Sequence, residues 1–305
     1  RFITPLVPFA ERRTITMKVI DSHIHVSNIE SFKYTANNIS FLDYSSSGLK
    51  EEFQKSGIVA AIGMGLTEQK PDGFPDMASP NPMMLDLEAE IPGFVAVCPG
   101  INPVLLERNG SAELDNIEMV LSRPDVVGVK IYAGYYPYYV HDKVYEPVYL
   151  MAEKYNLSVV IHGGATYSDR CCLKHSHPLE VDELAVRHRY LNIVIAHLGD
   201  PWVMDTAVLV SKNDNVFADL SGLVVSNEDG IRKVRADRLA MEHVKQALVY
   251  AERYKKILFG SDWPLAPVMP YIEFVRDLIP EEFHDDVFYN NALKAFPKLN
   301  GFINY

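Results

Sequence analysis

Short apolar segments alternate with longer segments of helical periodicity along most of the chain, and this rhythm limits the possible folds more than any other feature. Eight apolar runs are rich in β-branched residues and have the length of strands. They cover residues 18–22, 59–64, 93–98, 126–132, 158–162, 192–197, 216–220 and 256–260. Amphipathic segments between them, including residues 47–56, 112–122, 145–155 and 239–254, predict helices.

Alternating strands and helices imply parallel strands that are joined by right-handed crossovers. Eight such units predict an α/β protein in which the strands close into a (β/α)8 barrel. A doubly wound sheet is the competing arrangement, but no Gly-x-Gly-x-x-Gly motif follows a predicted strand. The barrel is therefore the fold that we expect.

The length of 305 residues suits a single barrel domain with loop insertions at its C-terminal face. We expect this domain to span residues 17–305, and residues 1–16 to form an N-terminal arm or a non-native leader. Loops 67–91 and 132–141 follow predicted strands. They would therefore extend over the C-terminal face, where the walls of barrel active sites form.

Composition restricts the partners of the chain. The formal net charge of -11 argues against nucleic acid or an anionic membrane surface as the main partner. No apolar run approaches the roughly 18 residues of a membrane span. The three cysteines form no disulfide framework, which suggests free thiols in a reducing, cytoplasmic compartment. A small molecule is the partner that we expect.

Polar side chains of metal-ligand type stand at the ends of four predicted strands. His23 and His25 follow the first, His162 the fifth, His197 the sixth and Asp262 the eighth. A buried His or Asp is costly unless it is paired, hydrogen-bonded or bound to metal. In a barrel these strand ends converge on one mouth. The joint pattern predicts a metal site of imidazoles and a carboxylate, and these ligands suit Zn²⁺, Mn²⁺, Fe²⁺ or Co²⁺.

A metal site of this kind indicates a hydrolase. The ion would lower the pKa of a bound water and polarise a substrate carbonyl. Asp262 is expected to take the proton of that water and pass it to the leaving group, while also touching the metal. His197, where it is not a ligand, would stabilise developing negative charge. A barrel that has lost activity and serves as a binding protein is the non-enzymatic alternative.

The pattern resembles the amidohydrolase superfamily, within it the amidohydrolase-related (amidohydrolase 2) group, which includes aminocarboxymuconate semialdehyde decarboxylase and dicarboxylate lactonases. The matching segments are Asp21-Ser22-His23-Ile24-His25, Gly128-Val129-Lys130, Ile161-His162-Gly163-Gly164, Ala196-His197-Leu198-Gly199 and Phe259-Gly260-Ser261-Asp262-Trp263-Pro264. They follow the order of the family. The last of them is the most specific, whereas a His-x-His pair alone would be weak.

The resemblance implies that His23, His25, His162 and Asp262 hold one metal ion and that His197 assists catalysis. In two-metal members of the superfamily a carboxylated lysine bridges the ions, and Lys130 lies near that position. We expect one ion per chain and an uncarboxylated Lys130. Hydrolysis of a lactone, amide or ester leads the interpretation. Nonoxidative decarboxylation of an aromatic or unsaturated acid is the alternative, because both reactions use the same ligands.

Weaker features follow the fourth and fifth predicted strands. Arg170, His175 and His177 could bind a substrate carboxylate, or could form a solvated loop. Tyr135 begins a tyrosine cluster that could cover a flat substrate or form the interface of a homodimer.

Overall fold

The protein is represented by a computed structural model, which describes residues 17–27, 29–65, 94–169 and 171–303. The expectations for residues 1–16, for the loop 67–91 and for Arg170 concern residues outside this part of the chain.

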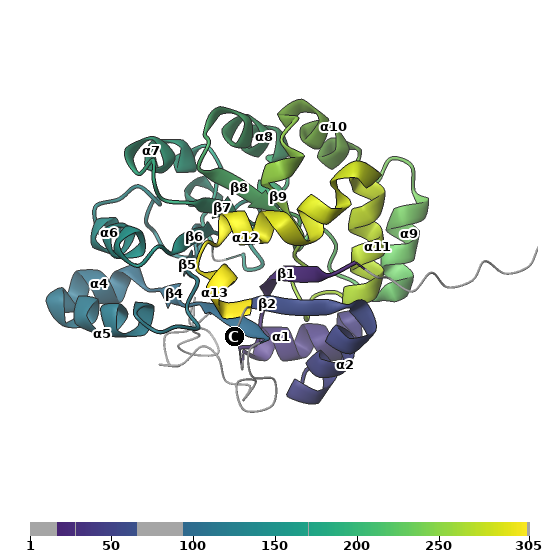
Figure 1. The fold of residues 1–305 in the computed structure, drawn as a ribbon, viewed down its shortest axis with the longest axis horizontal. Coiled ribbons are helices and arrows are strands. Elements are labelled where there is room, and N and C mark those ends of the chain that lie inside the picture. Colours follow the sequence, from purple (N-terminus) through teal and green to yellow (C-terminus); the bar gives the residue numbers. More distant parts are fainter. Residues whose placement is uncertain (1–16, 28, 66–93, 170, 304–305) are drawn as a thin grey trace, which may run out of the picture.

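Parallel strands form the centre of the molecule in two sheets (Figure 1). The first sheet contains β1 (Val19–Ile24), β2 (Ile58–Met64) and β3 (Val95–Cys98) in that order. The second runs in order through β4 (Gly100–Ile101), β5 (Gly128–Ile131), β6 (Ser158–Ile161), β7 (Ile193–Ile195), β8 (Val216–Asp219) and β9 (Ile257–Leu258). Strand order thus follows chain order throughout, as a (β/α)8 barrel requires.

Backbone hydrogen bonds join the two sheets at both seams. At the first seam, β3 and β4 continue one strand that is interrupted at Pro99. The amide of Lys130 donates to the Pro99 carbonyl at 2.8 Å. At the second seam, the amide of Ser22 donates to the Phe259 carbonyl at 3.0 Å, and that of Asp262 to the His23 carbonyl at 2.8 Å. The strands therefore close into a ring, which confirms the predicted barrel; the third predicted run, 93–98, ends before Pro99 and does not include β4.

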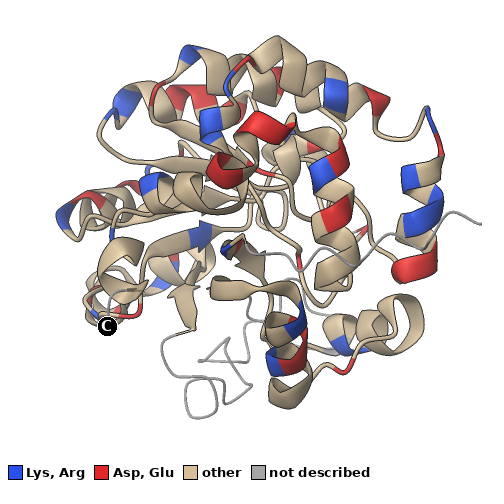
Figure 2. Cartoon of the chain, turned by 45° about the vertical axis from the view of Figure 1, so that its right-hand side comes forward, with Lys and Arg blue, Asp and Glu red and all other residues tan. Residues whose placement is uncertain are grey.

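Most helices surround this ring, whereas α12 (Asn291–Ala295) and α13 (Leu299–Ile303) lie across its middle in Figure 1. The surrounding helices are α1 (Glu30–Thr35), α2 (Ser46–Ser56), α4 (Pro103–Asn109), α5 (Ser111–Leu121), α6 (Glu146–Lys154), α7 (Glu180–Arg187), α8 (Val203–Lys212), α9 (Glu228–Ala236), α10 (Glu242–Ala251) and α11 (Val268–Leu278). The four predicted helices correspond to α2, α5, α6 and α10. Figure 2 shows that many charged residues lie on these outer helices. None of the helices in the described residues is long and apolar enough to cross a membrane.

Neighbouring residues of one strand serve different parts of the core. In β6, Val159 packs in the layer between strands and helices, whereas Val160 belongs to the cluster inside the barrel. This division follows from the alternation of side chains along a strand. Phe296 and Leu299, at the ends of α12 and α13, complete the inner cluster. The inside of the barrel is therefore packed with side chains, which leaves the strand ends and their loops to form a site.

Candidate metal centre

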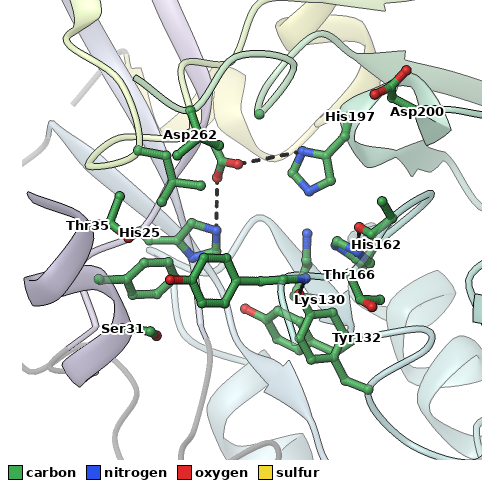
Figure 3. Close-up of a pocket in the computed structure, with 17 residues that line it drawn as sticks. His25, Ser31, Thr35, Lys130, Tyr132, His162, Thr166, His197, Asp200 and Asp262 are labelled. Atoms are coloured by element: carbon green, nitrogen blue, oxygen red, sulfur yellow. Dashed lines mark hydrogen bonds and ion pairs between the residues drawn. The ribbon is translucent and has the colours of Figure 1, made fainter. Parts of the chain in front are cut away.

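The polar strand-end side chains lie together around one cavity (Figure 3). The cavity has a volume of about 240 Å³. Its walls include His25, Lys130, His162, His197 and Asp262. The convergence that the sequence predicts for these strand ends is thus present in the structure.

His23 is completely buried and is oriented by a carboxylate that the sequence analysis missed. Its Nδ1 lies 2.9 Å from Oδ2 of Asp219, the last residue of β8. A carboxylate only accepts hydrogen bonds, so the ring proton is on Nδ1 and Nε2 keeps its lone pair. Burial lowers the pKa of His23 to about 3, and the nearby Lys130 ammonium adds to this effect. The ring is therefore neutral at physiological pH.

His25 has the same tautomer for a different reason. Its Nδ1 lies 3.2 Å from the carbonyl oxygen of Met64, at the end of β2. The ring stacks on Phe32 of α1, with centroids 4.5 Å apart and planes inclined by 24°. The proton on Nδ1 again leaves a lone pair on Nε2. Both histidines of the opening pair therefore present an electron-pair donor.

The two imidazoles face one oxygen of Asp262. Oδ1 of Asp262 lies 3.1 Å from Nε2 of His25 and 3.7 Å from Nε2 of His23 (Figure 3 shows the contact with His25). This oxygen is buried and has no hydrogen-bond donor in the described residues. Three lone-pair donors thus face one another, with the Lys130 ammonium group 3.5 Å from Nε2 of His23. A buried group in this position needs a cation, and the nitrogen and oxygen donors suit the divalent ions expected from the sequence.

Asp262 itself is a carboxylate. Burial raises the pKa of its carboxyl, whereas the charge that the adjacent His23, His197 and His25 rings carry when they are protonated lowers it well below the usual range. Its backbone has a left-handed φ of 60°, which is uncommon for a residue other than glycine and is found disproportionately at functional sites.

His197 lies near the other carboxylate oxygen of Asp262, Oδ2, in a turn that follows β7. Its φ is 60°, and its amide donates to Oδ1 of Asp219 at 3.0 Å. Its Nδ1 lies 3.1 Å from the carbonyl oxygen of Ser221 and 3.7 Å from Oδ2 of Asp262. The carbonyl places the proton on Nδ1, and Figure 3 shows the other ring nitrogen turned toward the cavity. Burial lowers the pKa of His197, so this nitrogen carries a lone pair.

His162 lines the same cavity, but the structure does not join it to the cluster as closely. Its ring centroid lies 5.0 Å from that of His197. Its Nε2 lies 3.0 Å from the carbonyl oxygen of Ala165, which leaves Nδ1 as the lone-pair donor. Within the described chain, ligand atoms mutually within 4.8 Å are found for His23, His25 and Asp262, and for His23, His197 and Asp219. Three of the four predicted ligands are therefore grouped, and the fourth lies on the wall.

Lys130 is buried beside this cluster. Its Nζ lies 3.5 Å from Nε2 of His23 and 5.4 Å from the centre of the Tyr132 ring. Burial lowers the pKa of Lys130 to about 8. This pKa is still above neutral pH, so the side chain brings a cationic group to the cavity wall.

The weaker predictions from the sequence have mixed outcomes. Tyr135 lines the cavity, with its ring 5.0 Å from that of His162. His175 instead packs against Tyr139, at 4.4 Å between ring centroids. His177 lies against Trp202, outside the cavity lining. Of the residues that the sequence analysis missed, Asp219 could have been found by the rule that singled out Asp262, because it also is a carboxylate at a strand end.

The fold and the site define a (β/α)8 barrel with a histidine–aspartate cluster at the C-terminal ends of its strands. The sequence model of the amidohydrolase family matches residues 20–298, and the chain belongs to this family. A comparison with curated proteins found no match.

Several solved structures share the fold. A probable 2-pyrone-4,6-dicarboxylic acid hydrolase from Acinetobacter baumannii, with citric acid bound, is 16% identical, covers 92% of this chain and 100% of its own, and has a TM-score of 0.61. A 2,6-dihydroxybenzoate decarboxylase from Rhizobium is 15% identical, with 92% and 98% covered and a TM-score of 0.61. An amidohydrolase from Burkholderia multivorans, with bound zinc, is 18% identical, with 92% and 99% covered and a TM-score of 0.61.

Proposed function

We propose that this protein is a metal-dependent hydrolase that adds water to the carbonyl group of a small lactone, ester or amide. The observation that carries the proposal is the buried Oδ1 of Asp262, which faces two imidazole lone pairs and has no hydrogen-bond donor in the described residues. His23, His25 and Asp262 would hold one divalent ion, Zn²⁺ or else Mn²⁺, Fe²⁺ or Co²⁺. Nδ1 of His162 is proposed as the fourth donor.

A divalent ion in this position lowers the pKa of a water molecule toward neutrality and polarises a substrate carbonyl. Asp262 has a second oxygen, Oδ2, on the side of His197. This oxygen would accept a proton from the attacking water as the new carbon–oxygen bond forms. Asp262 would then return the proton to the leaving oxygen or nitrogen as the old bond breaks. The carboxylate ends the cycle in the state in which it began.

His197 and Lys130 would complete the machinery from the cavity walls. The sequence analysis assigned charge stabilisation to His197, but the Ser221 carbonyl leaves an unprotonated ring nitrogen on its cavity side. We therefore assign His197 as an acceptor for a substrate hydrogen or for a proton. Lys130 is proposed to stabilise the negative charge that develops on the carbonyl oxygen, since its ammonium group is buried beside the cluster.

One observation favours nonoxidative decarboxylation as a second candidate. Aromatic side chains of Phe32, Tyr132, Tyr135 and Tyr167 line the cavity. Such walls suit a planar, unsaturated ring. The same carboxylate and histidines could then deliver a proton to a ring carbon as carbon dioxide leaves.

Isotope labelling separates the two reactions. Metal-loaded protein would be incubated in ¹⁸O-water with a panel of lactones, esters and amides and with a panel of aromatic carboxylic acids. Mass spectrometry is expected to find ¹⁸O in an acid product from the first panel. Release of carbon dioxide from the second panel, with no ¹⁸O incorporation from the first, would overturn the hydrolase proposal in favour of the decarboxylase.

A further inference from the structure

Gly222 lies on the cavity wall beside Asp262 and His197. It follows β8, lines the cavity and has a left-handed φ of 65°. A Cβ atom added at this position would lie 2.6 Å from Oδ2 of Asp262 and 2.7 Å from Nδ1 of His197. Contacts this short do not occur for real Cβ atoms, so at least one of the two side chains would have to move.

The two side chains have little freedom to move away. Oδ2 of Asp262 and Nδ1 of His197 are only 3.7 Å apart, so a methyl group would crowd both at once. The amide of His197 is held by Asp219, and its Nδ1 by the Ser221 carbonyl. The backbone of Asp262 is tied to β1 through its amide, which donates to the carbonyl of His23 at 2.8 Å. Relief of the crowding would therefore disturb the hydrogen bonds that set this geometry.

Backbone conformation alone does not account for Gly222. Gly57, the C-cap residue of α2, has a similar φ of 70°. A Cβ atom at Gly57 would meet only the carbonyl oxygen of Met17, at an ordinary 3.5 Å. Alanine carries the cost of a left-handed φ at both positions. Only at Gly222 does it also press on a carboxylate and an imidazole.

We propose that Gly222 is a positioning residue: its lack of a side chain lets Oδ2 of Asp262 and Nδ1 of His197 approach to 3.7 Å beside the cavity and sets the distance between them. The catalytic consequence rests on the proposed function, whereas the steric relationship does not. Displacements of about 1 Å in a reactive site can lower rates about 100-fold. A methyl group at position 222 should therefore act mainly on turnover.

A double-mutant cycle on stability tests the steric relationship without substrate or metal. Gly222→Ala and the matched control Gly57→Ala would be made in the wild-type chain and in a chain that carries Asp262→Ala and His197→Ala. In the wild-type chain, we expect Gly222→Ala to lower the urea midpoint more than Gly57→Ala does. In the chain that carries Asp262→Ala and His197→Ala, the truncated chain, we expect the two glycine substitutions to lower the midpoint by about the same amount. The proposal would be overturned if Gly222→Ala lowered the urea midpoint more than Gly57→Ala by the same margin in both chains. Should Gly222→Ala fail to fold in the wild-type chain, recovery of folded protein in the truncated chain supports it, and continued failure refutes it.

A second measurement addresses the site itself. Co²⁺ binding and turnover would be compared for the wild-type, Gly222→Ala and Gly57→Ala proteins. We expect a kcat about 100-fold lower for Gly222→Ala, with a smaller change in KM, and an altered visible spectrum of bound Co²⁺, while Gly57→Ala matches the wild type. Wild-type kinetics and spectrum in Gly222→Ala would overturn the positioning role. Failure of the wild-type protein to bind Co²⁺ would instead defeat the proposed metal centre, and the stability cycle would still decide the role of Gly222.

Discussion

The side chains of His23 and Asp219 are hydrogen-bonded at 2.9 Å, although 196 positions separate them in the chain. This contact selects the tautomer of His23, and through Oδ1 the same carboxylate accepts the amides of His197 and Ser221. Asp219 therefore connects both sides of the proposed metal centre without lining the cavity itself.

Asp219→Asn should weaken metal binding. Every hydrogen bond of Asp219 is accepted, so an amide NH2 group in either orientation would face a donor. Loss of such a supporting partner typically costs about 10- to 100-fold in metal affinity. Competition with a chromophoric chelator would measure the affinity. Asp205→Asn is the matched control, since Asp205 lies near His177 outside the cavity; equal affinities for the two variants would contradict the prediction.

Asp262→Asn should abolish most turnover and leave the fold intact. The amide cannot accept the proton of the attacking water, and general acid–base groups typically contribute about 10²- to 10⁴-fold. Steady-state assays, with circular dichroism and metal content measured on the same sample, would check this. Asp277→Asn, which removes a surface contact to Arg235, serves as control. Activity retained by Asp262→Asn would remove this residue from the mechanism.

The purified protein should bind close to one divalent ion per chain. The lone pairs of His23 and His25 and the carboxylate of Asp262 define a single position, and Lys130 is expected to be uncarboxylated. Elemental analysis after metal loading would give the stoichiometry. Removal of the ion with a chelator should lower the melting temperature, because the three donors then face one another without the divalent ion that joins them. A consistent value near two ions would show that the interpretation of Lys130 is wrong.

The metal-free protein should lose stability in mild acid. Burial lowers the pKa of His23 to about 3 and also lowers the pKa values of His162 and His197. The unfolded chain binds protons at these residues near pH 6.5, before the folded chain does, so the stability present above that pH is lost as pH falls toward the folded pKa values. Each imidazole contributes a slope of at most about 1.4 kcal/mol per pH unit.

Urea unfolding between pH 7 and pH 4 would measure this slope. His162→Asn should make the slope shallower, because one imidazole no longer contributes to the difference in bound protons between the unfolded and the folded chain. An unfolding free energy that stays constant over this range would contradict the assignment of neutral, buried rings.

The cysteines should react with thiol reagents in the order of their exposure. Cys172 is exposed, whereas Cys98 is buried and its pKa is strongly raised by that burial. Burial also raises the pKa of the partly exposed Cys171 to about 11. A native titration at pH 8 should therefore modify Cys172 first, Cys171 slowly and Cys98 only after unfolding. Rapid modification of Cys98 in native protein would be incompatible with the packing inside the barrel.

Most of the barrel could be predicted because its strands are local patterns. The run at 158–162 is a continuous apolar segment, as expected for a strand buried on both faces, and it becomes β6. Pro99 shows the limit of this approach, since the third predicted run ends before it and misses β4, which continues the strand and pairs with β5. Periodicity predicts that a strand exists, whereas the partner of each backbone amide depends on the neighbouring strand.

The sequence by itself determined that imidazoles and a carboxylate stand at strand ends, because side-chain type and strand position are both local properties. Only the tertiary structure decided what these groups can do. The carbonyls of Met64, Ala165 and Ser221 select the nitrogen that carries the proton on three histidine rings. The space that Gly222 leaves beside Asp262 likewise depends on how close the segment after β8 lies to the segment after β9. Such relationships depend on residues that are far apart in the chain, and no local pattern encodes them.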